Sequence, residues 1–125
     1  MNTVFNYLYR DGSNYKQWGS VVFARAVTDL LAQRFVRSLE SGEFFIADQL
    51  RLPEAFPDTW PIYADDHCWH EWEGFELSDS SPDDLLSRTI EEFVLEAEEA
   101  RIHRWKDFDP QQRVRRTVRL HDGGR

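Results

Sequence analysis

The sequence predicts a single α+β domain in which a small antiparallel sheet of about four strands packs against two helices. Three observations predict this fold class: residues 3–9 alternate with a period of two, and residues 28–39 and 82–105 carry apolar side chains at helical spacing. The chain of 125 residues has the length of one domain, and 41% of its residues are apolar. We expect an α+β domain at residues 1–106 and a basic C-terminal tail at residues 107–125.

The first two strands are predicted to form an antiparallel hairpin. In the first strand, three aromatic side chains share one face because side chains alternate along a strand: Phe5, Tyr7 and Tyr9. The Asp-Gly pair that follows is typical of a turn. Residues 20–24 are predicted as the second strand, so residues 11–19 are expected to form a long connection.

A helix and a short strand are predicted next. Thr28 is a suitable N-cap for the helix. Apolar side chains then recur every four residues, which places them on one helix face: Leu31, Phe35 and Leu39. The pair Ser41-Gly42 is expected to close the helix, and residues 43–47 are predicted as the third strand.

The second half of the domain is predicted to hold one strand and one long acidic helix. The aromatic content of residues 65–77 predicts a strand, and a helical turn is the alternative because Trp69 and Trp72 also fit a spacing of three. Ser81 is the expected N-cap of a helix at residues 82–105 that covers the sheet. Its apolar face is predicted to contain Leu86, Ile90, Phe93, Ala97 and Ala100.

The formal net charge of −8 combines two parts of opposite sign. Residues 1–100 contain 7 basic and 20 acidic side chains, whereas residues 101–125 contain 8 basic and 3 acidic ones. The densest acidic block, residues 65–99, has 13 acidic side chains and the single basic residue Arg88. This asymmetry indicates an electrostatic partner. The alternative is a solvated helix face followed by a basic tail.

Several classes of protein are excluded by what the sequence lacks. Its apolar runs are a few residues long, whereas a membrane-spanning helix needs about 20, and its N-terminus carries no secretory leader. Cys68 is the one cysteine, so no internal disulfide forms and a cytoplasmic location is predicted. Phosphate-binding glycine loops, CxxC pairs and GxSxG turns are absent, and no cofactor is expected.

A first candidate site is a cluster of potential metal ligands at residues 65–73. It comprises Asp65, Asp66, His67, Cys68, His70, Glu71 and Glu73. On a strand, His67 shares a face with Asp65 and Glu71, so the three could hold a divalent ion or provide a histidine–carboxylate pair for acid–base chemistry. Their spacing matches no standard zinc signature. The alternative is that the neighbouring tryptophans are core residues and the histidines lie at the edge of the core.

A second candidate site is the hairpin connection, which is rich in polar side chains beside an aromatic strand. Loops of this kind bind ligands on a rigid scaffold. The candidate binding residues here are Asn14, Tyr15 and Trp18. Taken over both clusters, the candidate catalytic residues are His67, Glu71, Asp11 and Lys16. The alternative is a capped turn in which Asp11 and Asn14 bond to the local backbone.

Two stretches of the sequence show a resemblance to other proteins. They are YRDGSNYK at residues 9–16, followed by GSVVF at residues 19–23, and DDHCWHE at residues 65–71. Both resemble segments of small uncharacterised bacterial cytosolic proteins. The resemblance implies no activity, catalytic residue or cofactor, but it implies that the two polar clusters belong together. The basic tail is not part of it.

The sequence favours a binding protein over an enzyme. We expect an acidic accessory module of the immunity or inhibitor type that docks on a basic protein partner. The acidic helix supplies the expected binding residues Glu92, Glu96 and Glu99. One alternative is a metal-assisted hydrolase or nuclease centred on residues 65–73.

A second alternative gives the basic tail the main role. In this hypothesis the protein is a homo-oligomer in which the tail of one subunit binds the acidic helix of its neighbour, through Arg113, Arg115 and Arg116. The acidic residues 1–100 repel nucleic acid, so contact with nucleic acid is expected only through the tail. No contact with a membrane is expected.

Overall fold

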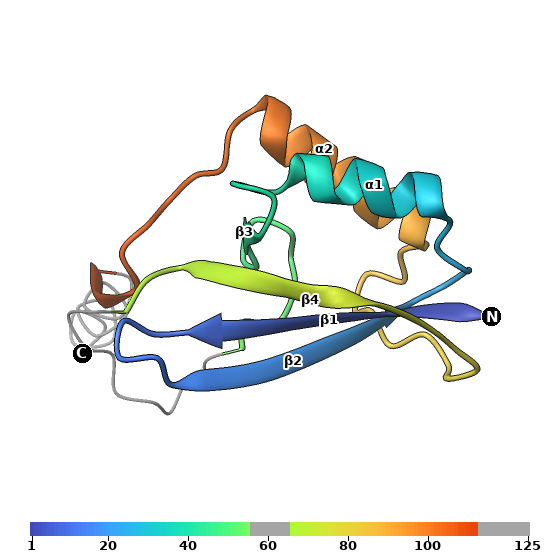
Figure 1. Cartoon of the computed structure of the whole chain (residues 1–125), viewed down its shortest axis with the longest axis horizontal. Coiled ribbons are helices and arrows are strands. Elements are labelled where there is room, and N and C mark those ends of the chain that lie inside the picture. Colours follow the sequence, from blue (N-terminus) through green and yellow to red (C-terminus); the bar gives the residue numbers. More distant parts are fainter. Residues whose placement is uncertain (56–65, 113–125) are drawn as a thin grey trace, which may run out of the picture.

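The computed structural model describes residues 1–55 and 66–112. Its strands are β1 (Asn2–Arg10), β2 (Lys16–Phe23), β3 (Phe44–Ile46) and β4 (Trp69–Ser78), and its helices are α1 (Asp29–Ser38) and α2 (Ile90–Ile102). The strands form one antiparallel sheet in the order β2-β1-β4-β3, and both helices lie on the same face of it (Figure 1). The predicted α+β fold is therefore confirmed.

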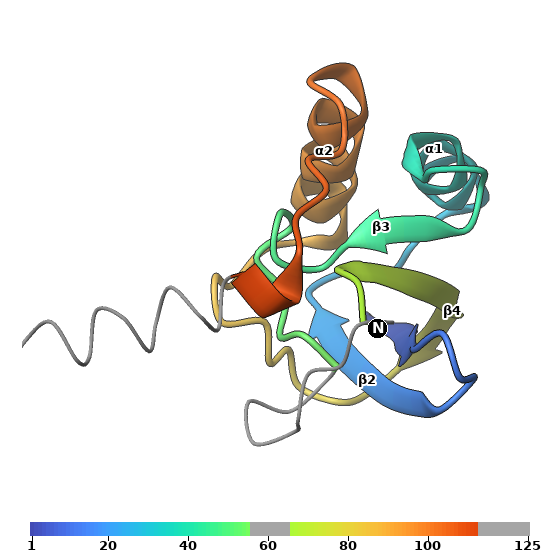
Figure 2. The same ribbon diagram turned by 90° about the vertical axis from the view of Figure 1, so that its left-hand side faces the viewer.

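The face of the sheet that the helices cover, here the inner face, carries an aromatic core. Phe5 in the central strand β1 is fully buried, and its ring centroid lies 5.4 Å from that of Phe35 in α1 and 5.0 Å from that of Phe93 in α2. Tyr7 and Tyr9 are also buried, as the alternation in β1 predicts. The two helices contact each other and lie side by side above the sheet (Figure 2).

Strand β2 begins at Lys16, so the expected long connection at residues 11–19 is wrong. Gly19 lies opposite Tyr7 in the register of β1 and β2, and the Tyr7 ring covers it. A Cβ atom on Gly19 would approach Cζ of Tyr7 to 2.8 Å. The Tyr7 hydroxyl is held in turn by a hydrogen bond of 2.5 Å to the carbonyl oxygen of Pro53. This segment has low strand propensity, and an aromatic ring from the neighbouring strand supplies its packing.

Replacing Gly19 with alanine is expected to lower the free energy of unfolding by about 1–3 kcal/mol, because the Tyr7 ring must move to admit the methyl group. Urea unfolding measures the loss. In a Tyr7→Leu background the same substitution should cost less, since the ring is gone. An equal loss in both backgrounds would show that the ring is not the cause.

Helix α1 begins as predicted and ends earlier than predicted. The Thr28 side chain accepts a hydrogen bond from the backbone N–H of Leu31, and the expected apolar face is buried. The helix ends at Ser38 because its cap, Leu39, is extended. Gly42 has a positive φ of 71° and belongs to the turn that leads into β3.

Strand β4 begins at Trp69, so residues 66–68 precede it instead of belonging to it, and the alternative of a helical turn is not observed in Trp69–Ser78. Its pairing with β1 shifts by one residue, because Gly74 lies opposite Asn6 while Trp72 lies opposite Tyr7. Gly74 has a φ of 120°, which favours glycine. The extra residue at this β-bulge is Glu73.

The predicted start of the acidic helix is wrong. Helix α2 begins at Ile90, and Thr89 rather than Ser81 is its N-cap, in a capping box completed by Glu92. It ends at Ile102 instead of residue 105. The predicted apolar face holds for the four residues that lie within α2, whereas Leu86 precedes the helix and is exposed.

Residues 82–89 follow the edge of β2 instead of forming a helix. The backbone N–H of Val22 donates to the Asp83 carboxylate at 2.7 Å, and the carbonyl oxygen of Val22 accepts from the N–H of Asp83 at 3.0 Å. Farther along, Ala24 exchanges backbone hydrogen bonds with Arg88 and Ile90. Asp83 therefore caps the edge of β2, although it lies at the predicted start of the helix.

Arg88 secures this segment from inside the protein. The Arg88 side chain is 4% exposed, and its five N–H donors all have acceptors. Two contact the Asp84 carboxylate, both at 2.9 Å, and two contact the carbonyl oxygens of Leu50 and Arg51 at 2.7 and 3.4 Å. The last reaches the Glu96 carboxylate at 2.7 Å. Arg88 thus joins α2 to two loops that are distant in sequence.

The chain after α2 returns to the body of the domain. The Trp105 indole N–H donates to the carbonyl oxygen of Ser38 at 3.0 Å, and the Cys68 thiol donates to Asp107 at 3.1 Å. The first residues of the predicted tail therefore contact the domain. The predicted tail residues Arg113, Arg115 and Arg116 lie outside the described residues. Neither helix of the described part is long and apolar enough to cross a membrane.

Candidate functional site

The two predicted polar clusters lie together at one end of the sheet, as the resemblance implied. Arg10, the last residue of β1, donates to both carboxylate oxygens of Glu71, from Nε at 2.9 Å and from Nη2 at 3.3 Å. Its Nη1 donates to the side-chain oxygen of Asn14 at 2.6 Å. Arg10 therefore links the hairpin turn to β4, and both acceptors are engaged within the protein.

His67 is held by backbone groups on both sides of its ring. Nδ1 accepts the backbone N–H of Trp69 at 3.0 Å, which assigns the ring proton to Nε2. Nε2 then donates to the carbonyl oxygen of Arg10 at 2.7 Å. A metal needs a free lone pair on an imidazole nitrogen, and this arrangement leaves none. The geometry favours a structural His67 that fastens the end of β4 to β1.

The remaining catalytic candidates lie in or beside the hairpin turn. The Asp11 carboxylate accepts the backbone N–H groups of Ser13 and Tyr15, both at 2.9 Å, as in a capped turn. Lys16 is exposed at the start of β2. Among the described residues, no three histidine, cysteine or acidic side chains are grouped to hold a metal ion, and Asp65 lies outside those residues. The metal site stays a prediction.

Two further ligand candidates of this cluster, Cys68 and His70, are buried. His70 donates from Nδ1 to the carbonyl oxygen of Cys68 at 3.2 Å and accepts the N–H of Ala55 on Nε2 at 3.0 Å. Burial lowers the pKa of His70 to about 4, so its ring is neutral at pH 7. Burial also raises the pKa of the Cys68 thiol to about 12, which keeps it protonated. Neither side chain is presented to a ligand.

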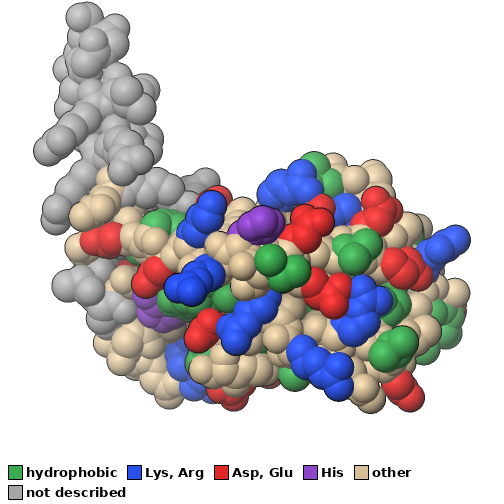
Figure 3. Space-filling view, turned by 90° about the horizontal axis from the view of Figure 1, so that it is seen from above, with side chains coloured by type: hydrophobic (Ala, Val, Ile, Leu, Met, Phe, Trp, Pro, Cys, Tyr) green, Lys and Arg blue, Asp and Glu red, His purple; other side chains and the backbone are tan. Residues whose placement is uncertain are grey.

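The surface of helix α2 is less negatively charged than its sequence suggests, because arginines of other segments form ion pairs with some of its glutamates. Glu98 receives two hydrogen bonds from Arg34 of α1, at 2.5 and 3.1 Å. Glu96 accepts from Arg51 as well as from Arg88. Seen from the helix side, acidic and basic side chains are interspersed (Figure 3).

The predicted binding residues of α2 therefore have different roles. Glu96 is an internal ion-pair partner, and the Glu92 side chain closes the capping box. Glu99 is exposed and lines a shallow hollow of about 370 Å³ that it shares with basic side chains, among them Arg51 and Lys106. A continuous acidic docking surface on α2 is not what the structure contains.

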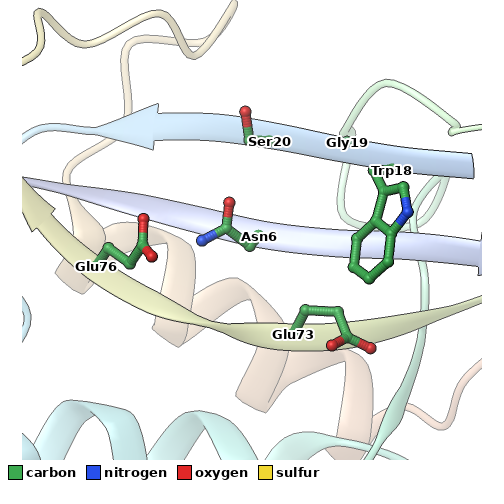
Figure 4. A pocket seen from close by; sticks show the side chains of 6 residues that line it. All are labelled: Asn6, Trp18, Gly19, Ser20, Glu73 and Glu76. Carbon is green, nitrogen blue, oxygen red and sulfur yellow. The ribbon is translucent and has the colours of Figure 1, made fainter.

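Free carboxylates lie instead on the outer face of the sheet, the face turned away from the helices. An open depression of about 450 Å³ there is lined by Asn6, Trp18, Gly19, Ser20, Glu73 and Glu76. The side chains project from three adjacent strands, with the Trp18 ring directed across β1 toward Glu73 (Figure 4). Trp18 is 63% exposed. Among the described residues, neither Glu73 nor Glu76 forms an ion pair within 4.0 Å.

Most of this depression escapes prediction from sequence. Trp18 is the one predicted binding residue that lines it, and Asn14 and Tyr15 lie in the turn beyond it. In the structure the side chains at positions 16, 18 and 20 are exposed, an alternation typical of a strand with one face in solvent. On β4 the bulge at Gly74 interrupts that alternation and conceals that Glu73 and Glu76 share a face.

No protein-family model, curated protein or solved structure matches this chain. Its function is therefore inferred from the arrangement of its own side chains. That arrangement offers an exposed indole, two free carboxylates and two small polar groups on one open face. These groups attract and orient a cation, and they include no nucleophile paired with a general base.

Proposed function

We propose that this chain is a small cytoplasmic binding module of the immunity or inhibitor type, which docks a basic segment of a protein partner on the outer face of its sheet. One contrast supports the proposal. Three of the five glutamates of α2 form ion pairs with Arg25, Arg34, Arg51 or Arg88, whereas neither Glu73 nor Glu76, which line the depression with the exposed Trp18, has such a pair within the described chain.

The chemistry of the depression fits a lysine or arginine side chain. A cation over the face of an indole gains about 0.5–1 kcal/mol at an exposed site, and more when water is excluded. Glu73 interacts electrostatically with Arg10, but the Arg10 guanidinium already forms an ion pair with Glu71. The negative charge of residues 1–100 adds long-range attraction, which speeds the encounter with a basic partner.

A matched pair of charge variants tests which surface docks. We expect Glu73→Gln with Glu76→Gln to weaken binding of a synthetic peptide of alternating arginine and valine about tenfold, as measured by titration calorimetry at low salt. Glu92→Gln with Glu99→Gln makes the same charge change on α2 and should leave the affinity within about twofold. The reverse ranking, or an affinity insensitive to salt, would contradict the proposal.

The metal-assisted hydrolase or nuclease and the tail-joined homo-oligomer remain predictions. The first needs ligands from residues 65–73, where His67 and Glu71 are engaged by backbone and by Arg10. The second needs the tail residues beyond 112, which lie outside the described residues. No contact among the described residues favours either over a binding module.

A further inference from the structure

We propose that the partner segment binds as an added strand on the open edge of β2, along residues 16–20, with basic side chains at alternate positions. This inference rests on the proposed function and specifies how the partner binds. It is carried by the hydrogen-bonding pattern of β2 and by the segment that covers only part of its edge.

The pairing pattern shows which backbone groups of β2 point away from the sheet. Along an antiparallel pair, residues alternate between bonding to the neighbouring strand and pointing outward. Val22 points outward, because its N–H and carbonyl oxygen bond to Asp83 rather than to β1. Two and four residues earlier, Ser20 and Trp18 therefore also direct their N–H and carbonyl groups outward.

The part of the chain that the structure describes covers this edge at one end and leaves it open at the other. Residues 83–90 occupy the outward groups of Val22 and Ala24. Within the described ranges, the outward groups of Trp18 and Ser20 have no hydrogen-bond partner. Proteins usually protect such edges with charge, proline or bulges, and Lys16 is the single charged residue of this stretch. An unprotected edge accepts an extended peptide through main-chain hydrogen bonds.

The outer face next to this edge determines the side chains that fit. An added strand lies about 4.8 Å from β2. Those of its side chains that lie on the outer face of the sheet therefore stand beside Trp18. An arginine there can lie across the indole ring, which extends toward Glu73 and so directs the cation to a free carboxylate (Figure 4). The occupant we infer is thus an extended, arginine- or lysine-bearing segment of the partner protein.

One proline substitution separates this mode from binding on the face alone. Ser20→Pro removes an outward N–H and places a ring on the edge without breaking a bond to β1. We expect it to weaken binding of the alternating arginine–valine peptide at least tenfold in the full-length chain, while Ser20→Ala changes the affinity less than twofold. Circular dichroism and thermal unfolding establish that both variants are folded.

Hydrogen exchange of the wild-type chain supplies a second measurement that needs no variant. We expect the amides of Trp18 and Ser20 to exchange rapidly alone and at least tenfold more slowly with the peptide bound. Binding without that protection, or with equal affinity in both Ser20 variants, overturns strand addition but leaves the proposed face intact. Absence of binding at millimolar peptide overturns both.

Discussion

Replacing Arg88 with alanine is expected to lower the free energy of unfolding by about 3–5 kcal/mol, the largest loss we expect from any single substitution. The change leaves the Asp84 carboxylate, 2% exposed, without its cation, and it leaves the carbonyl oxygens of Leu50 and Arg51 without donors. It also removes the guanidinium from the rings of Phe23 and Phe93, 5.5 and 5.4 Å away. Urea unfolding at pH 7 measures the effect.

Three further variants identify the cause of this loss. Arg88→Lys should recover little of it, because an ammonium group cannot replace a planar fork of five donors. The double variant Asp84→Asn with Arg88→Met should lose less than the sum of the two single losses, since it buries no lone charge. Arg37→Ala, at an exposed arginine of α1, is the control and should change stability by less than about 0.5 kcal/mol. A similar loss at both arginines would contradict the role assigned to Arg88.

Lowering the pH from 7.5 to 4.5 is expected to cost the protein about 2–3 kcal/mol through His70 alone. Burial lowers the pKa of this side chain from 6.5 to about 4 in the folded state. Between these values the unfolded chain binds a proton that the folded chain does not. The contribution of His70 to the free energy of unfolding is therefore fully present above pH 6.5 and is lost progressively as the pH falls toward 4.

The surroundings of His70 explain why its ring stays neutral. It packs among three aromatic rings, those of Tyr7, Tyr9 and Phe45, and this burial disfavours the charged form of the ring. The hydrogen bond to the carbonyl oxygen of Cys68 favours the charged form but does not compensate for burial. The resulting side chain acts as a neutral bridge between β4 and the backbone of Ala55.

His70→Gln tests this assignment, because glutamine can keep both hydrogen bonds but does not titrate. We expect the difference in unfolding free energy between pH 7.5 and 4.5 to shrink by about 2–3 kcal/mol in this variant. His103→Gln, at an exposed histidine, is the control and should leave the difference unchanged. Equal pH dependence in wild type and His70→Gln would refute the assignment.

Glu98 contributes to the pH dependence only at lower pH. The hydrogen bonds from Arg34 lower the pKa of Glu98 below its ordinary 4.5, so the contribution of Glu98 to stability is lost only below that pH.

The site shows how far sequence reasoning extends for a surface. The charge asymmetry along the chain is a property of the sequence, and it identifies residues 65–99 as the densest acidic block. It does not reveal which acids are free, because Arg34 and Glu98 are separated by 64 positions and Arg51 and Glu96 by 45. Ion pairs at such separations depend on how helices and loops pack. The carboxylates that we propose for docking therefore lie on the outer face of the sheet and not on α2.

Several elements can be predicted from signals that lie within a few neighbouring residues. Alternation predicts β1, the Thr28 cap and its apolar repeat predict the start and buried face of α1, and the spacing of Ile90 and Phe93 predicts the buried face of α2. These features arise within a few residues of one chain segment, where side-chain direction and backbone hydrogen bonding suffice.

Other features depend on contacts between segments that are far apart in the chain. Residues 82–89 have the composition of a helix start, yet Asp83 caps the edge of β2 and Asp84 is engaged by buried Arg88. Gly19 weakens β2 as a strand in isolation, yet the ring of Tyr7 covers it. In each case a partner remote in sequence outweighs a local preference of about 1 kcal/mol, because burying an unpaired charge or leaving a core position unfilled costs more.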